Sequence, residues 1–406
     1  MKFVLPRVIL GNRGDLASRW GLLRTLKRLG VHDVAVFSQF PQDIPPLDYE
    51  QRTYGKMRNA LLNREGRKAL LQSDVVLWAV GLDLQDDSSL AKLVYVWLQF
   101  HRYRWMGLRI WCLFQGAGPI TTLMGRKLAT GILKCVDVFI ARDPGTFRLI
   151  GSLSSKPRLL LGQDAIFLHG FEDDLQDVPE EEKFSAMLPD DNRPIIGVNI
   201  RQWFHFASSV LPYEFARQLY QERSEEKMSA LIDVYCKLIE SLRQQHDARI
   251  VLLSAYQPGV VPWEDDLPWL HRIKQFFADD PRVILVETPL SLPRYYQWMS
   301  SLDLMVGMRL HSSLTALRFG VPAINISYTL KGRDIYKHLG LEDHVIDLQS
   351  VLEDPHALIL VVNRVFDDLE GMRSRVRQGV SRVVEENVDL LSGLLKEVVI
   401  DTTRSD

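Results

Sequence analysis

Short apolar runs alternate with longer amphipathic segments along most of this chain, a pattern typical of α/β proteins with parallel sheets. In the first half it predicts strands at residues 4–10, 34–37, 74–80, 108–114 and 136–141, with a helix at 16–29. In the second half it predicts strands at 195–199, 249–254, 283–286, 302–306 and 323–327, with helices at 227–245, 269–278, 314–319 and over most of 357–399. The acidic stretch at 170–193 separates the two arrays and is interpreted as a linker.

This arrangement predicts the fold class α/β, with two Rossmann-like doubly wound domains that face each other across a cleft. We place the domains at residues 1–175 and 194–375, joined by a linker at 176–193. Residues 376–406 are expected to form a C-terminal helix that packs back on the first domain.

The stretch 307–331 gathers three chemically active side chains in one strand–helix–strand unit. Arg309 and His311 follow the strand at 302–306, and Lys331 follows the strand at 323–327. We expect Ser312 to be the N-cap of the intervening helix and Gly320 to end it. Because ligands of open parallel sheets bind at the carboxyl ends of strands, this unit predicts a site for an anion and for proton transfer.

The composition of the chain argues against nucleic-acid binding, a metal site and a membrane span. The chain has 406 residues, of which 46% are hydrophobic, and 49 basic residues nearly balance 51 acidic ones. No basic excess points to nucleic acid. No pair of the three cysteines has metal-ligand spacing, and the ten histidines form no metal pattern, so we expect no metal site. No apolar run approaches the length of a membrane span, and we expect a cytoplasmic protein.

Residues 93–111 are rich in both aromatic residues and arginines. One interpretation is an interfacial patch that meets a lipid-linked sugar. We favour the other, a core helix followed by a buried strand, because apolar residues occupy most of the helix circumference.

Six ordered motifs resemble the polysaccharide pyruvyl transferase family. They are Gly11-Asn12-Arg13-Gly14-Asp15, Leu84-Gln85-Asp86-Asp87-Ser88-Ser89, Gln115-Gly116-Ala117-Gly118-Pro119, Ala141-Arg142-Asp143, Gly197-Val198-Asn199-Ile200-Arg201, and Gly307-Met308-Arg309-Leu310-His311 with Lys331. The resemblance implies a GT-B-like pair of domains, with the acceptor on the first and the donor on the second. It implies transfer of pyruvate from phosphoenolpyruvate to a sugar of a surface polysaccharide or its lipid-linked precursor, forming a cyclic ketal and releasing phosphate.

The roles implied by the resemblance follow from the chemistry of that reaction. Holding a carboxylate and a phosphate requires cationic donors, and we predict Arg201, Arg309, Lys331 and Arg142 for this task. His311 would protonate the methylene carbon and Asp15 would accept the proton of the attacking hydroxyl. The acceptor-binding candidates are Asn12, Gln85, Asp86 and Gln115. We expect phosphoenolpyruvate as co-substrate with no other cofactor, and peripheral association with the inner face of the cell membrane as an additional expectation.

Several of these residues also have a purely structural interpretation. Arg201 would pair with an acidic neighbour, Asp15 would cap a helix beginning at Leu16, and Arg142 with Asp143 would form a cap and a salt bridge. Two other functions stay open. One is a GT-B glycosyltransferase that uses a sugar nucleotide. The other is a non-catalytic glycan-binding member of the family, supported by the single glycine, Gly81, where the family usually has a cluster.

Overall fold

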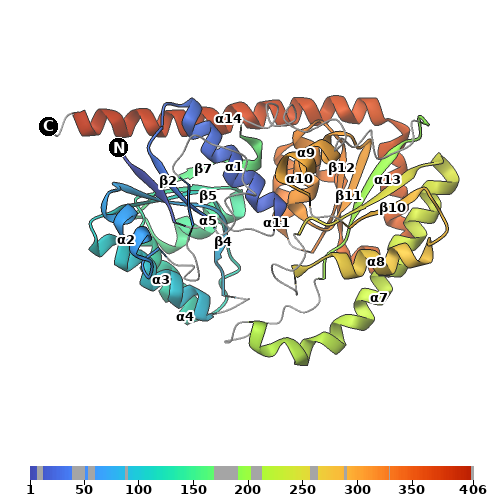
Figure 1. Cartoon of the computed structure of the whole chain (residues 1–406), viewed down its shortest axis with the longest axis horizontal. Helices are drawn as coiled ribbons and strands as arrows, with labels where there is room; N and C mark the ends of the chain where they lie inside the picture. Colours follow the sequence, from blue (N-terminus) through green and yellow to red (C-terminus); the bar gives the residue numbers. More distant parts are fainter. Residues whose placement is uncertain are drawn as a thin grey trace. The chain divides into compact units, whose positions relative to one another are not determined.

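The computed structural model describes residues 1–6, 12–38, 51–53, 60–86, 90–168, 191–202, 213–256, 264–287, 290–328 and 330–403. The chain forms two compact units (Figure 1). Unit 1 comprises Met1–Val8, Ser18–Gly170 and Val380–Asp406, and unit 2 comprises Ile9–Ala17 and Phe171–Gly379. The predicted linker lies for the most part outside the described residues.

Unit 1 contains a parallel sheet of seven strands in the order β3-β2-β1-β4-β5-β6-β7. The strands are β1 (Phe3–Leu5), β2 (Val34–Ser38), β3 (Gln51–Thr53), β4 (Val75–Leu84), β5 (Arg109–Ala117), β6 (Val138–Ala141) and β7 (Arg158–Leu161). The helices between them are α1 (Arg13–Arg28), α2 (Arg64–Leu71), α3 (Leu90–Trp105), α4 (Leu123–Leu133) and α5 (Pro144–Leu153), followed by the 3₁₀ turn η2 (Ala165–Phe167). Figure 1 shows α3 and α4 on one side of this sheet.

Unit 2 contains a parallel sheet of six strands in the order β10-β9-β8-β11-β12-β13. The strands are β8 (Ile195–Asn199), β9 (Arg249–Leu253), β10 (Val283–Val286), β11 (Leu304–Gly307), β12 (Ala323–Ser327) and β13 (Val345–Asp347). Its helices are α7 (Tyr213–His246), α8 (Leu267–Phe276), α9 (Leu292–Ser300), α10 (Leu310–Arg318), α11 (Leu330–His338), α12 (Leu348–Glu353) and α13 (Pro355–Asp367), with the turn η6 (Glu342–His344) before β13. Both sheets reverse their strand order beside their first strand, so the prediction of two Rossmann-like domains is confirmed.

The strands are apolar on both faces because helices cover both sides of each sheet. In unit 2, side chains such as Ile196 and Val198 of β8 pack with Leu231 and Leu238 of α7 in one buried cluster. In unit 1, a matching cluster joins the central strands to α3 and α4. The two cores fix the strand ends, which carry the polar residues considered below.

Helix α14 (Leu369–Thr403) contributes to both units. Its last part belongs to unit 1, where Asn387 accepts a hydrogen bond from the Gln163 amide (2.9 Å) and donates one to the Asp164 carbonyl (3.2 Å). Its first part belongs to unit 2, where a Cβ on Gly379 would lie 2.4 Å from the Leu339 carbonyl oxygen. Close approach therefore requires glycine at this position.

Three local predictions need correction. The strands expected at 74–80 and 108–114 run on to Leu84 and Ala117 as β4 and β5, so Gln115, Gly116 and Ala117 belong to a strand. Pairing between the two strands continues past the apolar runs and overrides the local pattern. The helix expected at 314–319 begins earlier, at Leu310, while Gly320 ends it as predicted with a positive φ of 78°.

Candidate active site

Parallel strands of unit 2 bring separate stretches of sequence to one edge of the sheet. β8 pairs with β11, and β11 with β12, all in the same direction. Arg201 follows β8 and Arg309 follows β11, so they lie at the same carboxyl edge. The backbone of Lys331 lies in α11 just after β12, but its side chain lies outside the described part of the structure.

Buried polar side chains connect this edge to helix α10. The Asn199 Oδ1 at the end of β8 accepts a hydrogen bond from the Arg309 amide (3.1 Å). The Asn199 Nδ2 donates to the Ser312 hydroxyl (3.3 Å), to which the Tyr295 hydroxyl also donates (3.1 Å). Asn199 therefore accepts a hydrogen bond from the backbone at the start of α10. The expectation that Ser312 is the N-cap is wrong, because the helix begins before Ser312. Because the helix begins at Leu310, His311 lies in its first turn.

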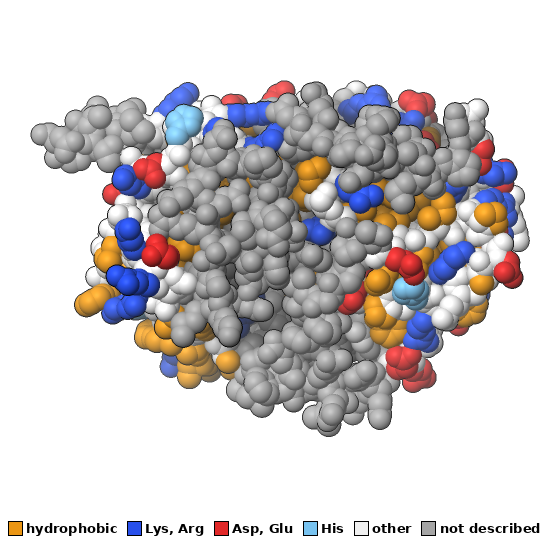
Figure 2. All heavy atoms as spheres, viewed as in Figure 1, with side chains coloured by type: hydrophobic (Ala, Val, Ile, Leu, Met, Phe, Trp, Pro, Cys, Tyr) orange, Lys and Arg blue, Asp and Glu red, His pale blue; other side chains and the backbone are white. Residues whose placement is uncertain are grey.

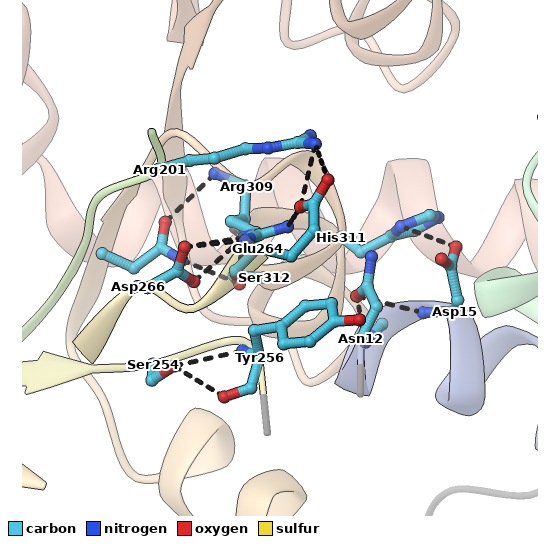
Figure 3. Close-up of polar contacts among 12 residues, drawn as sticks. Asn12, Asp15, Arg201, Ser254, Tyr256, Glu264, Asp266, Arg309, His311 and Ser312 are labelled. Carbon is cyan, nitrogen blue, oxygen red and sulfur yellow. Dashed lines mark hydrogen bonds and ion pairs between the residues drawn. The ribbon is translucent and has the colours of Figure 1, made fainter. Parts of the chain in front are cut away.

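Arg309 is buried against two carboxylates (Figure 3). Its Nε contacts both carboxylate oxygens of Asp266 (3.1 and 2.9 Å), and its Nη2 contacts Oδ1 of Asp266 (2.7 Å). Its Nη1 donates to Oε2 of Glu264 at 3.0 Å. Burial opposes the charged form, but attraction from Asp266 and then Glu264 outweighs it and raises the pKa of Arg309. Arg309 therefore remains charged.

Arg201 shares one of these carboxylates. Its Nη2 lies 3.0 Å from both oxygens of Glu264, its Nη1 donates to the Tyr328 hydroxyl, and its guanidinium lies over the Tyr328 ring. Burial again opposes the charge, while Glu264 raises the pKa of Arg201. The alternative that Arg201 pairs with an acidic neighbour is what the structure shows. Donor binding by Arg201 and Arg309 stays a prediction.

The side chains of His311 and Asp15 lie against one another within unit 2. The Nδ1 of His311 lies 3.4 Å from Oδ1 of Asp15, and their side chains are 12% and 19% exposed. Figure 3 shows the two side chains pointing toward one another from different helices. Because Nδ1 faces the carboxylate, a carboxylate–imidazole pair of this kind can orient the ring.

The start of α1 is held beside His311 by backbone contacts with unit 2. Asn12 forms an antiparallel bridge with Tyr256, and the Arg13 amide donates to the Ala255 carbonyl (3.0 Å). The Asn12 Oδ1 accepts from the amides of Gly14 (3.0 Å) and Asp15 (3.4 Å), so Asn12 caps the helix. The alternative of Asp15 as the cap of a helix beginning at Leu16 is therefore wrong, because the helix begins three residues earlier.

Gly14 leaves the space that the His311 side chain occupies. A Cβ on Gly14 would lie 1.9 Å from the His311 Cβ. We expect Gly14→Ala to displace the imidazole from Asp15. Because His311 is the predicted general acid, the turnover number should fall by about 100-fold. Steady-state kinetics of the reaction proposed below would measure this fall.

Gly393→Ala is the matched control for Gly14→Ala. Gly393 lies in helix α14, and a Cβ there meets nothing within 4 Å. It should leave turnover unchanged and raise stability slightly, because alanine favours the helix by about 1 kcal/mol over glycine. Equal activity of the two variants would contradict the packing argument.

The predicted site residues of unit 1 have internal partners. The Arg142 Nη1 lies 3.1 Å from Oδ2 of buried Asp164. The Gln115 Nε2 donates to the Trp78 carbonyl (3.0 Å). Gln85 is half-buried and follows β4. For Arg142 the salt-bridge interpretation holds with a different acid, since Asp143 instead accepts from the Thr146 amide (2.6 Å) as the cap of α5. Substrate binding by these residues stays a prediction.

Asp86 is the most heavily bonded of these residues. Its carboxylate accepts from the amides of Thr121 (2.8 Å) and Thr122 (2.7 Å) and from both hydroxyls. Burial raises the pKa of Asp86, but the hydrogen bonds from Thr122 and Thr121 together outweigh it and lower the pKa below its ordinary value of 3.8. These bonds join the end of β4 to the start of α4. Asp86 therefore has a structural role, and acceptor binding by Asp86 stays a prediction.

We expect Asp86→Ala to destabilise unit 1 by about 2 kcal/mol at neutral pH, because charged hydrogen bonds are lost. The pKa of Asp86 is lower in the folded state than in the unfolded state. The ionised carboxylate therefore contributes fully to the stability of unit 1 above pH 3.8, and this contribution is lost as the pH falls through the folded-state pKa. Hydrogen exchange of amides 121–127 should report it. Asp33→Ala is the control because its ion pair with Lys2 is exposed. Unchanged exchange in Asp86→Ala would exclude the role.

Comparison with known proteins identifies the family. The family model for polysaccharide pyruvyl transferase matches residues 12–329. The chain belongs to the polysaccharide pyruvyl transferase family. It is therefore a transferase. The amylovoran biosynthesis protein AmsJ of Erwinia amylovora is 35% identical over 88 residues, which are 22% of this chain and 20% of that protein.

Solved structures share the fold of this family member. A putative UDP-N-acetylglucosamine 2-epimerase from Listeria monocytogenes has a TM-score of 0.61 at 13% identity, covering 98% of this chain and 97% of that one. Sucrose-phosphate synthase from Thermosynechococcus elongatus has a TM-score of 0.56 at 14% identity, with full coverage of both chains. These likenesses show the GT-B-like fold with two Rossmann-like domains.

Sequence reasoning did not identify Glu264 and Asp266, the acids that hold the two arginines. Both belong to the run Trp263-Glu264-Asp265-Asp266 just before α8. A signal was present, because buried arginines require counter-charges and few acids stand near strand ends of the second half. Among the described residues, no group of three or more His, Cys, Asp or Glu side chains is arranged to hold a metal ion.

Proposed function

We propose that this transferase moves pyruvate from phosphoenolpyruvate to two hydroxyls of one sugar, forming a cyclic ketal and releasing phosphate. The observation that carries the proposal is the His311–Asp15 pair in a member of this family. It supplies an acid and a carboxylate at the carboxyl edge of a Rossmann-like sheet, where ligands of such folds bind. The acceptor is a sugar of a surface polysaccharide or its lipid-linked precursor.

In the proposed reaction, His311 donates a proton to the methylene carbon, which becomes the methyl group of the ketal. The neighbouring carbon then carries oxocarbenium character and is attacked by the first sugar hydroxyl. Asp15 stabilises the imidazolium before the imidazolium gives up its proton. Asp15 then accepts the proton of the attacking hydroxyl and passes this proton to His311. The second hydroxyl forms the second C–O bond as the C–O bond to phosphate breaks, and its proton leaves with phosphate. Atoms and charges balance without a redox partner.

Donor binding is assigned to Arg201, Arg309, Lys331 and Arg142. Arg201 and Arg309 both contact Glu264, and this shared contact bears on how Arg201 would bind the donor. The carboxylate of Glu264 is 20% exposed and occupies the N–H groups that an incoming dianion would need. We propose that the donor competes with Glu264 for Arg201, while Arg309 stays fixed by buried Asp266. Asn12, Gln85, Asp86 and Gln115 are assigned to the acceptor side.

Two measurements test the proposed function. The protein is incubated with phosphoenolpyruvate and a set of bacterial glycans, and phosphate release and pyruvylated product are followed. Thermal shift then compares phosphoenolpyruvate with UDP- and CMP-sugars. Stabilisation by phosphoenolpyruvate with acceptor-dependent phosphate release supports the proposal. Stabilisation by a sugar nucleotide alone would favour a glycosyltransferase, and binding of glycan without turnover would favour a non-catalytic member.

A further inference from the structure

The outer surface of helices α3 and α4 exposes large apolar side chains. The most exposed are Leu98 (56%), Met124 (57%), Trp105 (74%) and Leu123 (81%). Val94, Leu98 and Trp105 are one and two turns apart along α3 and therefore share one side of the helix. Figure 2 shows hydrophobic side chains (orange) together with Lys and Arg side chains (blue) at the lower left, where Figure 1 places α3 and α4. The interpretation of residues 93–111 as a core helix followed by a buried strand is therefore half right: only one side of α3 is buried, whereas β5 is buried as expected.

The two helices form one continuous surface. A Cβ on Gly131 of α4 would lie 2.6 Å from Nε1 of Trp97 on α3, so the helices pack closely there. Their inner sides join the core of unit 1 through residues such as Val96, Phe100 and Ile132. The apolar outer side chains are thus carried on rigid, well-packed helices.

The residues of α3 and α4 that carry a full charge are all basic. Neither α3 nor α4 contains an aspartate or a glutamate, although the chain as a whole has 51 acidic residues. The two helices carry the basic residues Lys92, Arg102, Arg104, Arg126 and Lys127. Arg104 pairs with Asp137 at 3.0 Å and so belongs to the fold. Arg102 lies over the Trp105 ring, 4.1 Å from its centroid, while Arg126 and Lys127 are exposed on α4.

A basic groove adjoins the exposed apolar side chains of α4. It has a volume of about 370 Å³ and is lined by Arg126, Lys127, Thr130, Gly131, Lys134, Ser152 and Leu153. No carboxylate lines it, and within the described ranges no ion pair engages Arg126, Lys127 or Lys134. The three cations match the chemistry of a phosphate group, because each offers charged hydrogen-bond donors. The hydroxyls of Thr130 and Ser152 instead donate to the carbonyls of Leu153 and Leu149.

We propose that the α3–α4 face binds the surface of a bilayer that contains anionic phospholipids. Exposed Leu98, Trp105 and Leu123 would enter the boundary between headgroups and acyl chains, and the groove would receive lipid phosphates. A combination of protruding apolar side chains, an aromatic residue and basic residues without acids is the one that such a surface attracts. The proposal goes beyond the proposed function because it requires neither phosphoenolpyruvate nor a sugar. Binding to the bilayer surface would also bring the protein close to a lipid-linked acceptor.

Co-sedimentation of the full chain with vesicles tests this proposal. Vesicles of phosphatidylcholine alone are compared with vesicles that also contain phosphatidylglycerol. We expect at least about tenfold stronger partitioning to the anionic vesicles, and a loss of about tenfold or more in each of two variants. One is Leu98→Glu with Trp105→Glu and Leu123→Glu, and the other is Arg126→Glu with Lys127→Glu and Lys134→Glu. Leu71→Glu with Phe276→Glu is the matched control, since these side chains are equally exposed elsewhere.

Two further arms distinguish the possible outcomes. Inorganic phosphate at vesicle-equivalent concentration should not release the protein if lipid headgroups within a bilayer are the ligand. Pyruvyl transfer to a soluble acceptor should be unchanged in both surface variants, so failure of membrane binding and failure of the proposed function are separable. Equal partitioning of wild type and both variants, absence of binding to anionic vesicles, or full release by phosphate would overturn the proposal.

Discussion

Replacing His311 by glutamine should lower phosphoenolpyruvate-dependent pyruvyl transfer by about 100- to 10,000-fold, the range of a lost general acid. Glutamine keeps a polar side chain of similar reach in the first turn of α10 but has no group that exchanges a proton near neutral pH. The fold should be retained because the imidazole is paired with Asp15 at the edge of unit 2 rather than in its core. The fall should therefore appear in the turnover number more than in donor affinity.

The control for this variant is His356→Gln, an exposed histidine at the start of α13 that should leave turnover unchanged. Asp15→Asn adds a second readout. If Asp15 stabilises the imidazolium and accepts a proton, its loss should lower turnover, and the effects of the single variants should not add in the double variant. Normal turnover in His311→Gln would remove His311 from the chemistry and would favour a different acid.

Replacing Arg309 by leucine should destabilise unit 2 by about 3–5 kcal/mol, because it leaves the buried carboxylate of Asp266 without its counter-charge. Asp266 is 1% exposed and receives three of the contacts from Arg309, and the Glu264 carbonyl receives another at 2.5 Å. Denaturant unfolding, with hydrogen exchange over residues 304–318, should show the loss at the end of β11 and the start of α10. Arg309→Lys should recover only part of it, since an ammonium cannot reproduce the fork of contacts.

Two variants make this expectation specific. Arg333→Leu removes an exposed arginine of α11 and should change the free energy of unfolding little. The double variant Arg309→Leu with Asp266→Leu removes the stranded charge and should be more stable than Arg309→Leu alone. If Arg309→Leu unfolds at the same denaturant concentration as wild type, the contacts of Arg309 with Asp266 and Glu264 do not stabilise the carboxyl edge of the unit 2 sheet.

Local pattern identified most of the structural framework. The strands at 34–37, 195–199, 283–286 and 323–327 have structural counterparts at nearly the same residues. Gly320 ends α10 with a positive φ, as its place after an amphipathic segment indicates. Boundaries were less accurate where pairing with a neighbour continues a strand, as it does for β4 and β5.

Contacts between distant residues could not be read from the chain in the same way. Nothing local places Glu264 and Asp266 beside Arg201 and Arg309, or brings the start of α1 to Tyr256 and His311. The exposure of Leu98 and Trp105 also depends on which side of α3 meets the sheet. Periodicity was weak there because apolar residues surround most of the helix.

By itself, the sequence determined that this chain is an α/β transferase of two Rossmann-like domains, with Arg309 and His311 just after one strand, because strand and helix periods and short motifs are local properties. The tertiary structure alone decided that His311 lies against Asp15, that Arg309 is held by buried Asp266 and shares Glu264 with Arg201, and that α3 and α4 present an apolar, basic face. Those outcomes depend on which residues the packed sheets bring together, and packing is set by the whole core rather than by any one segment.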